Sequence, residues 1–408
     1  GERMTEPARL SQTLKSAAMA LGFDLVGIAP AVTPLGFTRL QEWLQRGYAG
    51  EMSYLPRREA AYEHPRHVLD GVCSVVMVAV NYKSAEPPKG DTASTDQRPT
   101  IHDQPPFIPT RVAKYARGLS DYHDVLKDRL RKLSDVLHER VPGCRTRCVV
   151  DTAPLLERDF AQLAGLGWFG KNTLLIHKRA GSFLLLGALL TDVELEPDEP
   201  HETSHCGTCT RCLDVCPTDA FPVPYVLDAR KCISYLTIEL KGAIPQELRT
   251  GIGDWLFGCD LCQDVCPWNR KSPATMAADF QPRSDLTPAD ALDVLQLSAA
   301  DFRVRFRGTP LERPGYNGLR RNAAIVLGNS GNAAVIPALI AALDDPSPIV
   351  RGAVAWALGQ LGGPAARTAL QDRRGIEDNR DVTEELDAAL RHCSLPEAQG
   401  SHPLGNAP

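Results

Sequence analysis

The sequence has no apolar run long enough to cross a membrane, which takes about 20 consecutive apolar residues. It also lacks a strong excess of one charge: 45 Lys and Arg side chains face 50 Asp and Glu side chains, for a formal net charge of −5. A nucleic acid would therefore have to bind a local basic face. No secretory or twin-arginine signal opens the chain, and residues 1–3 are expected to be a cloning remnant. We expect a soluble, cytoplasmic protein without a membrane partner.

A nucleotide-binding P-loop is also missing. The glycine-rich stretch 165–173 contains Gly170 and Lys171, but it lacks the upstream glycine spacing of that motif and the Ser or Thr that follows it. Two interpretations remain open. The stretch is either a tight loop between a helix and a strand or a turn whose backbone approaches a bulky ligand closely.

Cysteine, by contrast, is abundant, and eight of the 12 cysteines fall between positions 206 and 266. The first four follow the bacterial ferredoxin spacing for iron–sulfur ligation, including the proline after the fourth. These are Cys206, Cys209, Cys212 and Cys216. The second run, Cys259, Cys262 and Cys266, lacks the cysteine that such a run would carry at Leu256. Cys232 lies between the two runs and supplies an eighth thiolate.

Eight thiolates suffice for two [4Fe-4S] clusters, and in two-cluster ferredoxins the fourth cysteine of a run ligates the other cluster. This cross-ligation assigns Cys206, Cys209, Cys212 and Cys266 to one cluster, and Cys216, Cys232, Cys259 and Cys262 to the other. Two zinc sites or disulfides are the alternatives, but this many close CxxC steps favours iron–sulfur clusters. The chain is therefore expected to carry electrons one at a time.

The first half of the chain alternates helix-periodic and strand-like segments, which indicates an α/β or α+β domain with a central sheet. The expected helices are 11–21, 37–45 and 121–140, and the expected strands are 24–29, 75–80, 148–151, 174–177 and 183–190. Residues 86–109 are rich in Pro, Asp and Thr and are expected to form a mobile loop.

Two polar sites stand out in this domain. Asp151 ends a predicted strand before a helix that begins near Leu155, and a helix N-cap is the ordinary role of an Asp in that place. A second predicted helix starts with Asp121, Tyr122 and His123, and so with an aromatic side chain and a histidine. A lone histidine in such a place is more often a surface or capping residue than a ligand.

A 31-residue repeat follows the cysteine region. The pattern that starts at Arg320 and ends at Gly331 recurs from Arg351 to Gly362, which is typical of HEAT-like helix pairs. We expect three domains: a cofactor-binding domain over 4–200, a ferredoxin-like domain over 201–275 and a HEAT-like repeat domain over 276–396. The arginines of the last domain have two interpretations, a solvated or structural helix face and a phosphate-contacting stripe. The residues concerned are Arg303, Arg305, Arg307, Arg320 and Arg321.

Together, the double cysteine module, Val150-Asp151-Thr-Ala-Pro154, Gly167-Trp-Phe-Gly-Lys-Asn-Thr173 and Cys266-Pro-Trp-Asn269 resemble epoxyqueuosine reductase. The resemblance spans nearly the whole chain. It implies a cobalamin-dependent enzyme that reduces epoxyqueuosine to queuosine at the wobble position of tRNA, with the cofactor beside one cluster. It also implies a monomer that receives electrons from a donor such as flavodoxin or ferredoxin.

The resemblance also implies roles for individual residues. Asp151 matches the family's proton donor, and Lys241 and the arginines named above are expected to meet tRNA. The expected cobalamin surroundings are Arg57, Lys114, Tyr115, Asp151, Asn172, Ser182, Ser234 and Gln263. The chain departs from the family pattern in its long loop at 86–109 and at Gly187-Ala188, where a polar residue is expected.

The implied chemistry is consistent with these residues. Removal of an epoxide oxygen takes two electrons and protons, and a carboxyl group donates protons poorly near neutral pH unless burial raises its pKa. We therefore expect Asp151 to lie in an apolar pocket with a raised pKa. A reductive dehalogenase uses the same cofactors and is the alternative enzyme, whereas an electron carrier with docking repeats would leave the first domain without a role.

Overall fold

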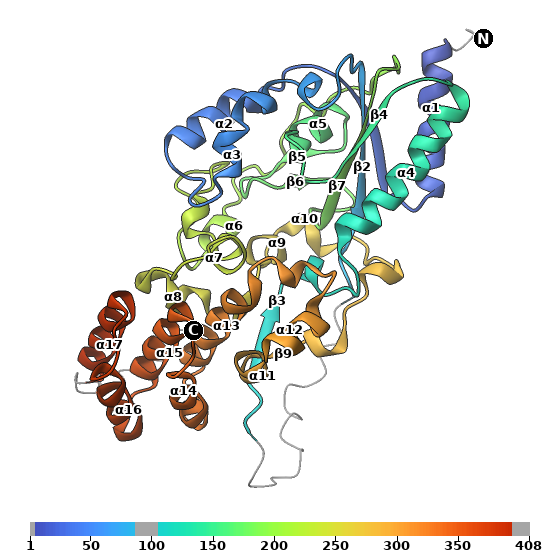
Figure 1. Ribbon diagram of the computed structural model, residues 1–408. Helices are drawn as coiled ribbons and strands as arrows, with labels where there is room; N and C mark the ends of the chain where they lie inside the picture. The colour runs from blue at the N-terminus through green and yellow to red at the C-terminus, as the bar shows by residue number, and fades with distance from the viewer. Residues whose placement is uncertain (1–4, 86–104, 394–408) are drawn as a thin grey trace, which may run out of the picture.

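The computed structural model describes residues 5–85 and 105–393, so that most of the predicted loop 86–109 lies outside the described residues. Its N-terminal half is built on a four-stranded antiparallel sheet in the order β1-β2-β7-β4 (Figure 1). The strands are β1 (Leu25–Pro30), β2 (Ser74–Asn81), β7 (Leu184–Thr191) and β4 (Thr146–Val149). Every residue of β2 is buried, because helices pack on both faces of the sheet.

The helices α1 (Glu6–Ala20) and α4 (Tyr122–Arg140) cover one face of this sheet, and α5 (Glu157–Leu163) covers the other. The apolar residues of α4 recur at helical spacing, which buries Leu126, Leu130, Leu133 and Leu137 against the sheet. The side chain of Asp121 caps α4 by accepting a hydrogen bond from the backbone N–H of His123. This cap places Tyr122 and His123 in the first helical turn, close to the end of β4.

The hairpin β5 (Trp168–Phe169) and β6 (Leu175–Ile176) projects toward the cysteine region. Helices α2 (Gly36–Gln45) and α3 (Tyr54–Arg57) lie outside the sheet. Short 3-10 segments connect many of these elements. They are η1 (Glu59–Glu63), η2 (Pro65–His67), η3 (Lys114–Ala116), η4 (Ala229–Lys231), η5 (Ala278–Phe280), η6 (Ser284–Leu286), η7 (Pro310–Glu312) and η8 (Ala333–Val335).

A second, three-stranded sheet joins parts of the chain that are far apart in sequence. Strand β3 (Pro109–Val112) pairs in parallel with β8 (Trp255–Phe257) and antiparallel with β9 (Ala289–Asp290). One hydrophobic core runs from Ile108 through these strands to Ala389. The three predicted domains therefore share strands and core, and β3 ties the first of them to both of the others.

The cysteine region folds into short helical turns with little regular structure between them. They are α6 (Arg211–Asp214), α7 (Ile233–Ile238), α8 (Gln246–Ile252), α9 (Leu261–Asp264) and α10 (Pro267–Arg270). The two equivalent turns α6 and α9, one from each cysteine run, lie against each other. Figure 1 shows this region between the N-terminal sheet and the C-terminal helices.

The C-terminal helices form the predicted repeats. They are α11 (Ala291–Gln296), α12 (Ala299–Phe306), α13 (Gly315–Asn329), α14 (Ile336–Ala342), α15 (Pro348–Leu361), α16 (Pro364–Arg374) and α17 (Arg380–His392). The repeated Leu-Gly step lies where neighbouring helices touch: a Cβ on Gly328 would stand 2.8 Å from the Cα of Ala357. Likewise, a Cβ on Gly359 would stand 2.8 Å from the Cβ of Ala389. Glycine is thus required at this position for close helix packing.

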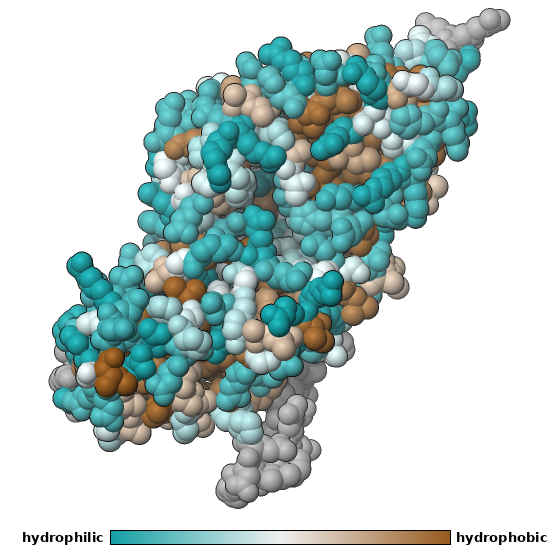
Figure 2. Space-filling view, in the orientation of Figure 1, coloured by the Kyte–Doolittle hydropathy of each residue, from teal (hydrophilic) through white to brown (hydrophobic). Residues whose placement is uncertain are grey.

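Hydrophilic side chains cover most of the face in view, with apolar residues scattered among them (Figure 2). No helix within 5–85 and 105–393 is both long and apolar enough to span a bilayer. The predicted helices and strands of the first domain are present within a few residues of their predicted ends. The expected α/β (α+β) domain, ferredoxin-like module and helical repeats are therefore confirmed.

Candidate active site

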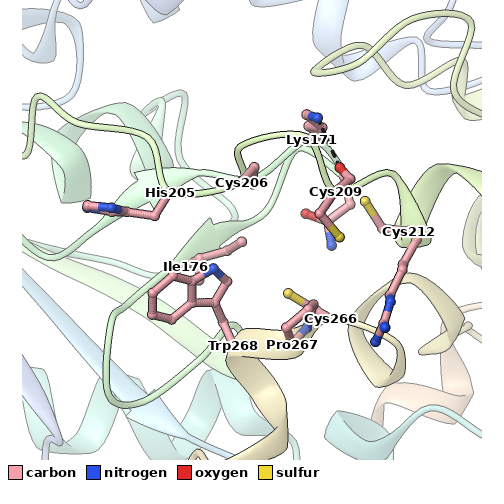
Figure 3. A pocket seen from close by; sticks show the side chains of 11 residues that line it. Lys171, Ile176, His205, Cys206, Cys209, Cys212, Cys266, Pro267 and Trp268 are labelled. Atoms are coloured by element: carbon pink, nitrogen blue, oxygen red, sulfur yellow. Dashed lines mark hydrogen bonds between the residues drawn. The ribbon is translucent and has the colours of Figure 1, made fainter.

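Four cysteines from both runs surround a cavity of about 260 Å³ (Figure 3). They are Cys206, Cys209, Cys212 and Cys266, the set that cross-ligation assigns to one cluster. Lys171 from the β5–β6 turn, His205 and Trp268 are among its other lining residues. The Lys171 ammonium donates hydrogen bonds to the carbonyls of Gly207 and Cys209, at 2.8 and 2.9 Å, and so fixes the loop that carries the first thiols.

The other four cysteines, Cys216, Cys232, Cys259 and Cys262, line a different cavity of about 400 Å³. Its remaining wall combines aromatic and aliphatic side chains with a few amide and hydroxyl groups. These residues include Tyr82, Tyr115, Tyr122, Leu184, Phe221, Ile233, Asn172, Ser234 and Gln263. The structure thus brings together each set of four cysteines that the spacing predicts, including Cys232, whose assignment followed from counting alone.

The thiols in both sets are poor ligands until a metal is bound. Burial and neighbouring thiols raise the pKa of Cys212 to about 11 and raise those of Cys259 and Cys262 further. A bound metal deprotonates such thiols, so the donor set suits a positively charged metal cluster. Across the described part of the chain, no three His, Cys, Asp or Glu side chains are placed to hold a single metal ion. The cysteines instead stand around cavities, as a cluster requires.

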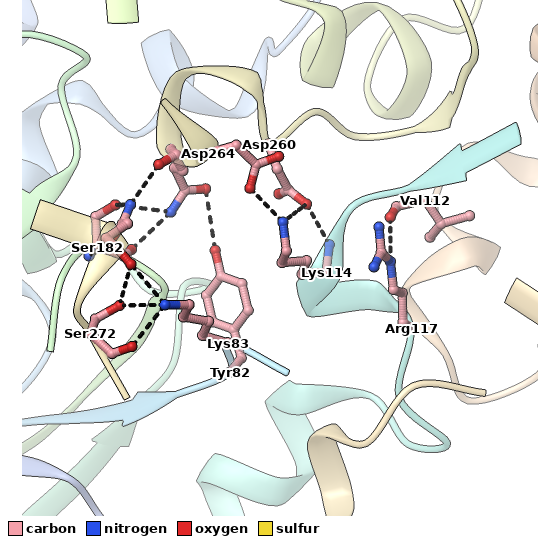
Figure 4. A network of polar contacts seen from close by, with 11 residues as sticks. Tyr82, Lys83, Val112, Lys114, Arg117, Ser182, Asp260, Asp264 and Ser272 are labelled. Atoms are coloured by element: carbon pink, nitrogen blue, oxygen red, sulfur yellow. Dashed lines mark hydrogen bonds and ion pairs between the residues drawn. The ribbon is translucent and has the colours of Figure 1, made fainter. Parts of the chain in front are cut away.

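Four of the predicted cobalamin residues line the second cavity: Tyr115, Asn172, Ser234 and Gln263. Lys114 and Ser182 do not line it but lie in a polar network next to it (Figure 4). The Gln263 amide donates to the Ser182 carbonyl at 2.9 Å, and the Lys114 ammonium pairs with Asp264 at 2.5 Å. This network fixes Gln263 and the α9 turn beside the second cavity.

Arg57 was expected near cobalamin but does not line this cavity. Its exposed guanidinium donates back to the carbonyl and hydroxyl of Ser53, at 3.0 and 2.6 Å, one turn earlier in the chain. Arg158 lines the cavity instead. Sequence reasoning missed Arg158 because it carries no motif and reaches the cavity only through the packing of α5.

Asp151 does not line the second cavity but contacts one of its lining residues, and its backbone has the left-handed angle φ +56°. Its Oδ2 accepts a hydrogen bond from the hydroxyl of Tyr122, itself a lining residue, at 2.5 Å. His123 Nε2 lies 3.2 Å from the same oxygen. The Asp151 backbone N–H donates to Oε1 of Glu157 at 2.5 Å.

Two expectations for Asp151 are wrong. It is not the cap of α5, because that helix begins at Glu157 after Leu156. It is also not in an apolar pocket, because its side chain is 52% exposed. Burial does raise the pKa of Asp151, but hydrogen bonds from His123 and Tyr122 outweigh this effect and hold the pKa below its ordinary value.

The predicted basic face is only partly available. Arg320 and Arg321 cannot bind phosphate, because both are buried. Arg320 bonds the Leu295 carbonyl and Asp345, and Arg321 donates to the carbonyls of Leu236, Leu240 and Gly242. Arg305 is held between the carboxylates of Asp285 and Asp293. These three side chains stabilise the fold.

The other predicted basic residues are exposed: Arg303, Arg307 and Lys241. Arg303 and Arg307 line an open hollow of about 420 Å³ beside α12. The carbonyl of Gly308, which follows Arg307, accepts a hydrogen bond from the backbone N–H of Asp121 at 2.9 Å. This contact places the end of α12 beside the start of α4, where Tyr122 and His123 contact Asp151. The charge of Arg313 lowers the pKa of Asp151. We refer to Lys241, Arg303, Arg307 and Arg313 together as the basic edge.

The fold and its sites define an iron–sulfur oxidoreductase with a C-terminal helical repeat. Residues 205–269 match the family model of the 4Fe-4S double cluster binding domain, and residues 315–391 match that of HEAT repeats. Residues 63–152, which end just after Asp151, match the model described as epoxyqueuosine reductase QueG, DUF1730.

Full-length relatives agree with these matches. The chain is 42% identical over 358 residues to the epoxyqueuosine reductase of Pseudomonas aeruginosa, covering 88% of this chain and 96% of that protein. It is 39% identical to the Escherichia coli protein of the same name, covering 88% of this chain and 92% of that protein. This chain belongs to the epoxyqueuosine reductase family. That membership decides between the two enzymes that the sequence left open.

Solved structures support the same assignment. A crystal structure of epoxyqueuosine reductase with an epoxyqueuosine-modified tRNA-Tyr stem loop matches with a TM-score of 0.85 and 30% identity, covering 95% of this chain and 99% of that one. The Bacillus subtilis enzyme, solved with its catalytic aspartate loop swung out of the active site, matches with a TM-score of 0.82 and 29% identity, covering 94% and 99%.

Proposed function

We propose that this chain reduces epoxyqueuosine at the wobble position of tRNA anticodons to queuosine. The observation that carries the proposal is a shared cavity: the second set of cysteines lines the same hollow as Tyr122, which holds Asp151 by a hydrogen bond. A site for electrons and a site for protons therefore meet at one place. Loss of an epoxide oxygen as water consumes two electrons and two protons and leaves a carbon–carbon double bond.

Cobalamin is the proposed cofactor of the second cavity. The cavity adjoins another hollow of about 420 Å³, with which it shares Arg158, Thr173 and Leu227. Aromatic and aliphatic walls with a few amide and hydroxyl groups fit a large, flat macrocycle that carries amide side chains. Bound cobalamin would supply a centre that collects two electrons from one-electron carriers. Tyr115, Asn172, Ser234 and Gln263 would hold it, and the network around Lys114 and Ser182 would keep Gln263 in place.

The basic edge formed by Lys241, Arg303, Arg307 and Arg313 is the proposed binding surface for the tRNA anticodon loop. RNA loops bind through phosphate contacts and through stacking on aromatic side chains. Tyr54, 38% exposed, lies 6.0 Å from the Arg313 guanidinium carbon and provides such a surface near Asp151. Replacing Arg303 and Arg307 by Glu should weaken binding of the tRNA and reduce its salt dependence, measured by titration at several salt concentrations. An unchanged salt slope would exclude these two residues from the interface.

An acidic one-electron carrier, such as a flavodoxin or ferredoxin, is the proposed electron donor. Its docking face would be the exposed surface beside the first cysteine cavity, where Arg211 and Arg270 border an open hollow of about 490 Å³. Neither guanidinium has a hydrogen bond or ion pair within 5–85 and 105–393. Of the two carboxylates in this hollow, Asp264 pairs with Lys114 and Asp214 accepts a hydrogen bond from Thr210. We also propose that the chain acts as a monomer.

Anaerobic reconstitution tests the proposed function. The chain is loaded with iron, sulfide and cobalamin, supplied with a reductant and incubated with epoxyqueuosine-containing tRNA. Nucleoside analysis should detect queuosine, and Asp151→Asn should bind cobalamin, seen by its visible absorption, but lose turnover by about 10²-fold or more. Full activity of Asp151→Asn would exclude the acid role. Turnover of an organohalide, but not of the tRNA, would favour a dehalogenase.

A further inference from the structure

His123 is the centre of a three-residue array at the start of α4. Its Nδ1 lies 2.6 Å from Oδ1 of Asp121, and its Nε2 lies 3.2 Å from Oδ2 of Asp151. The ring also stacks on Tyr122, with centroids 4.1 Å apart and planes 26° apart. Both ring nitrogens thus face carboxylate oxygens, which is the arrangement that favours a doubly protonated, positively charged imidazole.

The array is held in place from several sides. The same Oδ1 of Asp121 that contacts the ring accepts the backbone N–H of His123 at 2.9 Å, so helix capping also fixes the ring's partner. Glu157 holds the Asp151 backbone, and Tyr122 holds the Asp151 carboxylate. His123 therefore points at Asp151 through the geometry of the helix start.

This arrangement answers a difficulty in the proposed reaction. An Asp151 carboxyl group whose pKa lies below the ordinary value carries almost no proton at neutral pH, so that alone it is a poor acid. Loss of an epoxide oxygen as water nevertheless needs two protons. A protonated group in contact with Asp151 could supply these protons.

We propose that His123 supplies protons to Asp151 across the Nε2–Oδ2 contact, so that the histidine–aspartate pair, and not the carboxyl group alone, is the acid of the reaction. This inference rests on the proposed function. The two electrons come from the one-electron donor protein, each carbon–oxygen bond of the epoxide breaks in turn, and the oxygen leaves as water with two protons. The pair delivers the first proton through Asp151. His123, now neutral, regains a proton from solvent, and the pair then delivers the second proton. In this role His123 acts on the substrate only through Asp151, as a positioning and proton-supplying residue.

The charged surroundings favour this role. Burial lowers the pKa of His123, but the contacts with Asp121 and Asp151 raise it to about 9. Glu157, whose own pKa is raised to about 8 by burial and by Asp151, lies on the other side of the Asp151 backbone. Arg313 is a further charged group that faces Asp151. The pair should therefore keep its proton until the pH rises to about 9.

The first test needs neither cofactor nor turnover. The protonation of His123 is followed by NMR of histidine-labelled protein over a pH series, with the signal assigned by its absence in His123→Gln. The pKa of His123 should be about 9 in the wild type and lower in Asp151→Asn, which removes one of its two carboxylates and leaves the contact with Asp121. Titration of wild-type His123 near pH 6.5 would overturn the proposal, even if the chain turned out to have a different activity.

The second test is a pH profile of turnover. The wild type should hold its rate up to about pH 9. In His123→Gln, Asp151 must act alone, so the rate should fall by about tenfold per pH unit across the neutral range. Added imidazole should restore the rate of His123→Gly. A purely structural His123 would give a variant that is slower by the same factor at every pH and is not rescued by imidazole, which would contradict the proposal.

His138→Gln is the matched control. His138 lies on the same helix, is exposed and bonds only Thr146 and Cys144, at 3.1 and 3.5 Å, within the described chain. This variant should keep both the wild-type rate and the wild-type pH profile. A profile of His138→Gln shifted like that of His123→Gln would show that any change in α4 disturbs the site, and would remove the support for His123.

Discussion

Each of the two cysteine cavities is lined by four cysteines, but the cavities differ in volume and in most of the side chains around those cysteines. The first, about 260 Å³, is bordered by exposed residues such as His205, Pro267 and Arg211. The second, about 400 Å³, is walled by buried and half-buried aromatic and aliphatic side chains, and its lining residue Tyr122 contacts Asp151. This difference fits the proposed direction of electron transfer, in which electrons enter at the charged surface beside the first cavity and are used in the second cavity, next to the proposed proton source.

One tight turn connects the two cavities. In the β5–β6 hairpin, Lys171 fixes the loop of the first set, and the next residue, Asn172, lines both cavities. The Asn172 amide donates to the carbonyl of Cys262 at 3.3 Å. The glycine-rich turn therefore contributes side chains to the walls of both cysteine cavities.

Removing one ligand from each set is the strongest way to test this comparison. Cys262→Ser in the second set and Cys206→Ser in the first should each lower the iron content from about eight to about four per chain. Loss of the second cluster should abolish turnover with any reductant, because that cluster is next to the reaction. Loss of the first should abolish turnover with a protein donor but leave part of it with a small chemical reductant that can reach the second cavity.

Iron analysis and turnover with both reductants distinguish the two variants. Cys393→Ser is a suitable control, since Cys393 lies at the end of α17 and in neither cavity. It should keep full iron and activity. Equal residual activity of Cys206→Ser and Cys262→Ser with the small reductant would contradict the proposed order of electron transfer from the first cluster to the second.

The cysteine sets could be predicted from the sequence because ligand spacing is a local property that the short turns α6 and α9 preserve. The HEAT-like repeat was also predictable, since its period places Gly328 and Gly359 at equivalent helix contacts. Both features repeat along the chain, so a single sequence reveals them.

Other features depend on partners that are distant in sequence. Arg320 and Arg321 follow the spacing of an exposed row, but Arg321 is buried because carbonyls some 80 residues away accept its hydrogen bonds. The pKa of Asp151 was predicted in the wrong direction for the same reason. Its partners Tyr122 and His123 come from the preceding helix, and only packing against the sheet brings them to it.

A change at the surface beside the first cavity should have a smaller effect, on the binding of the donor protein. Arg211→Glu combined with Arg270→Glu reverses the charge of the proposed docking face without touching a cysteine. An acidic donor protein should then bind about tenfold more weakly or worse at low salt, because complementary charge steers such encounters. Calorimetric titration measures the binding directly, and the difference from the wild type should shrink as salt screens the charges.

The matched control reverses two exposed arginines of α4, in Arg131→Glu combined with Arg140→Glu, which changes the net charge by the same amount on a different face. If the donor responds to the overall charge of the protein, both double variants will weaken binding equally, and the docking face has no special role. If it docks beside the first cavity, only the Arg211 and Arg270 variant will lose affinity. Its turnover with a small chemical reductant will stay unchanged, because the second cavity and its proton source are untouched.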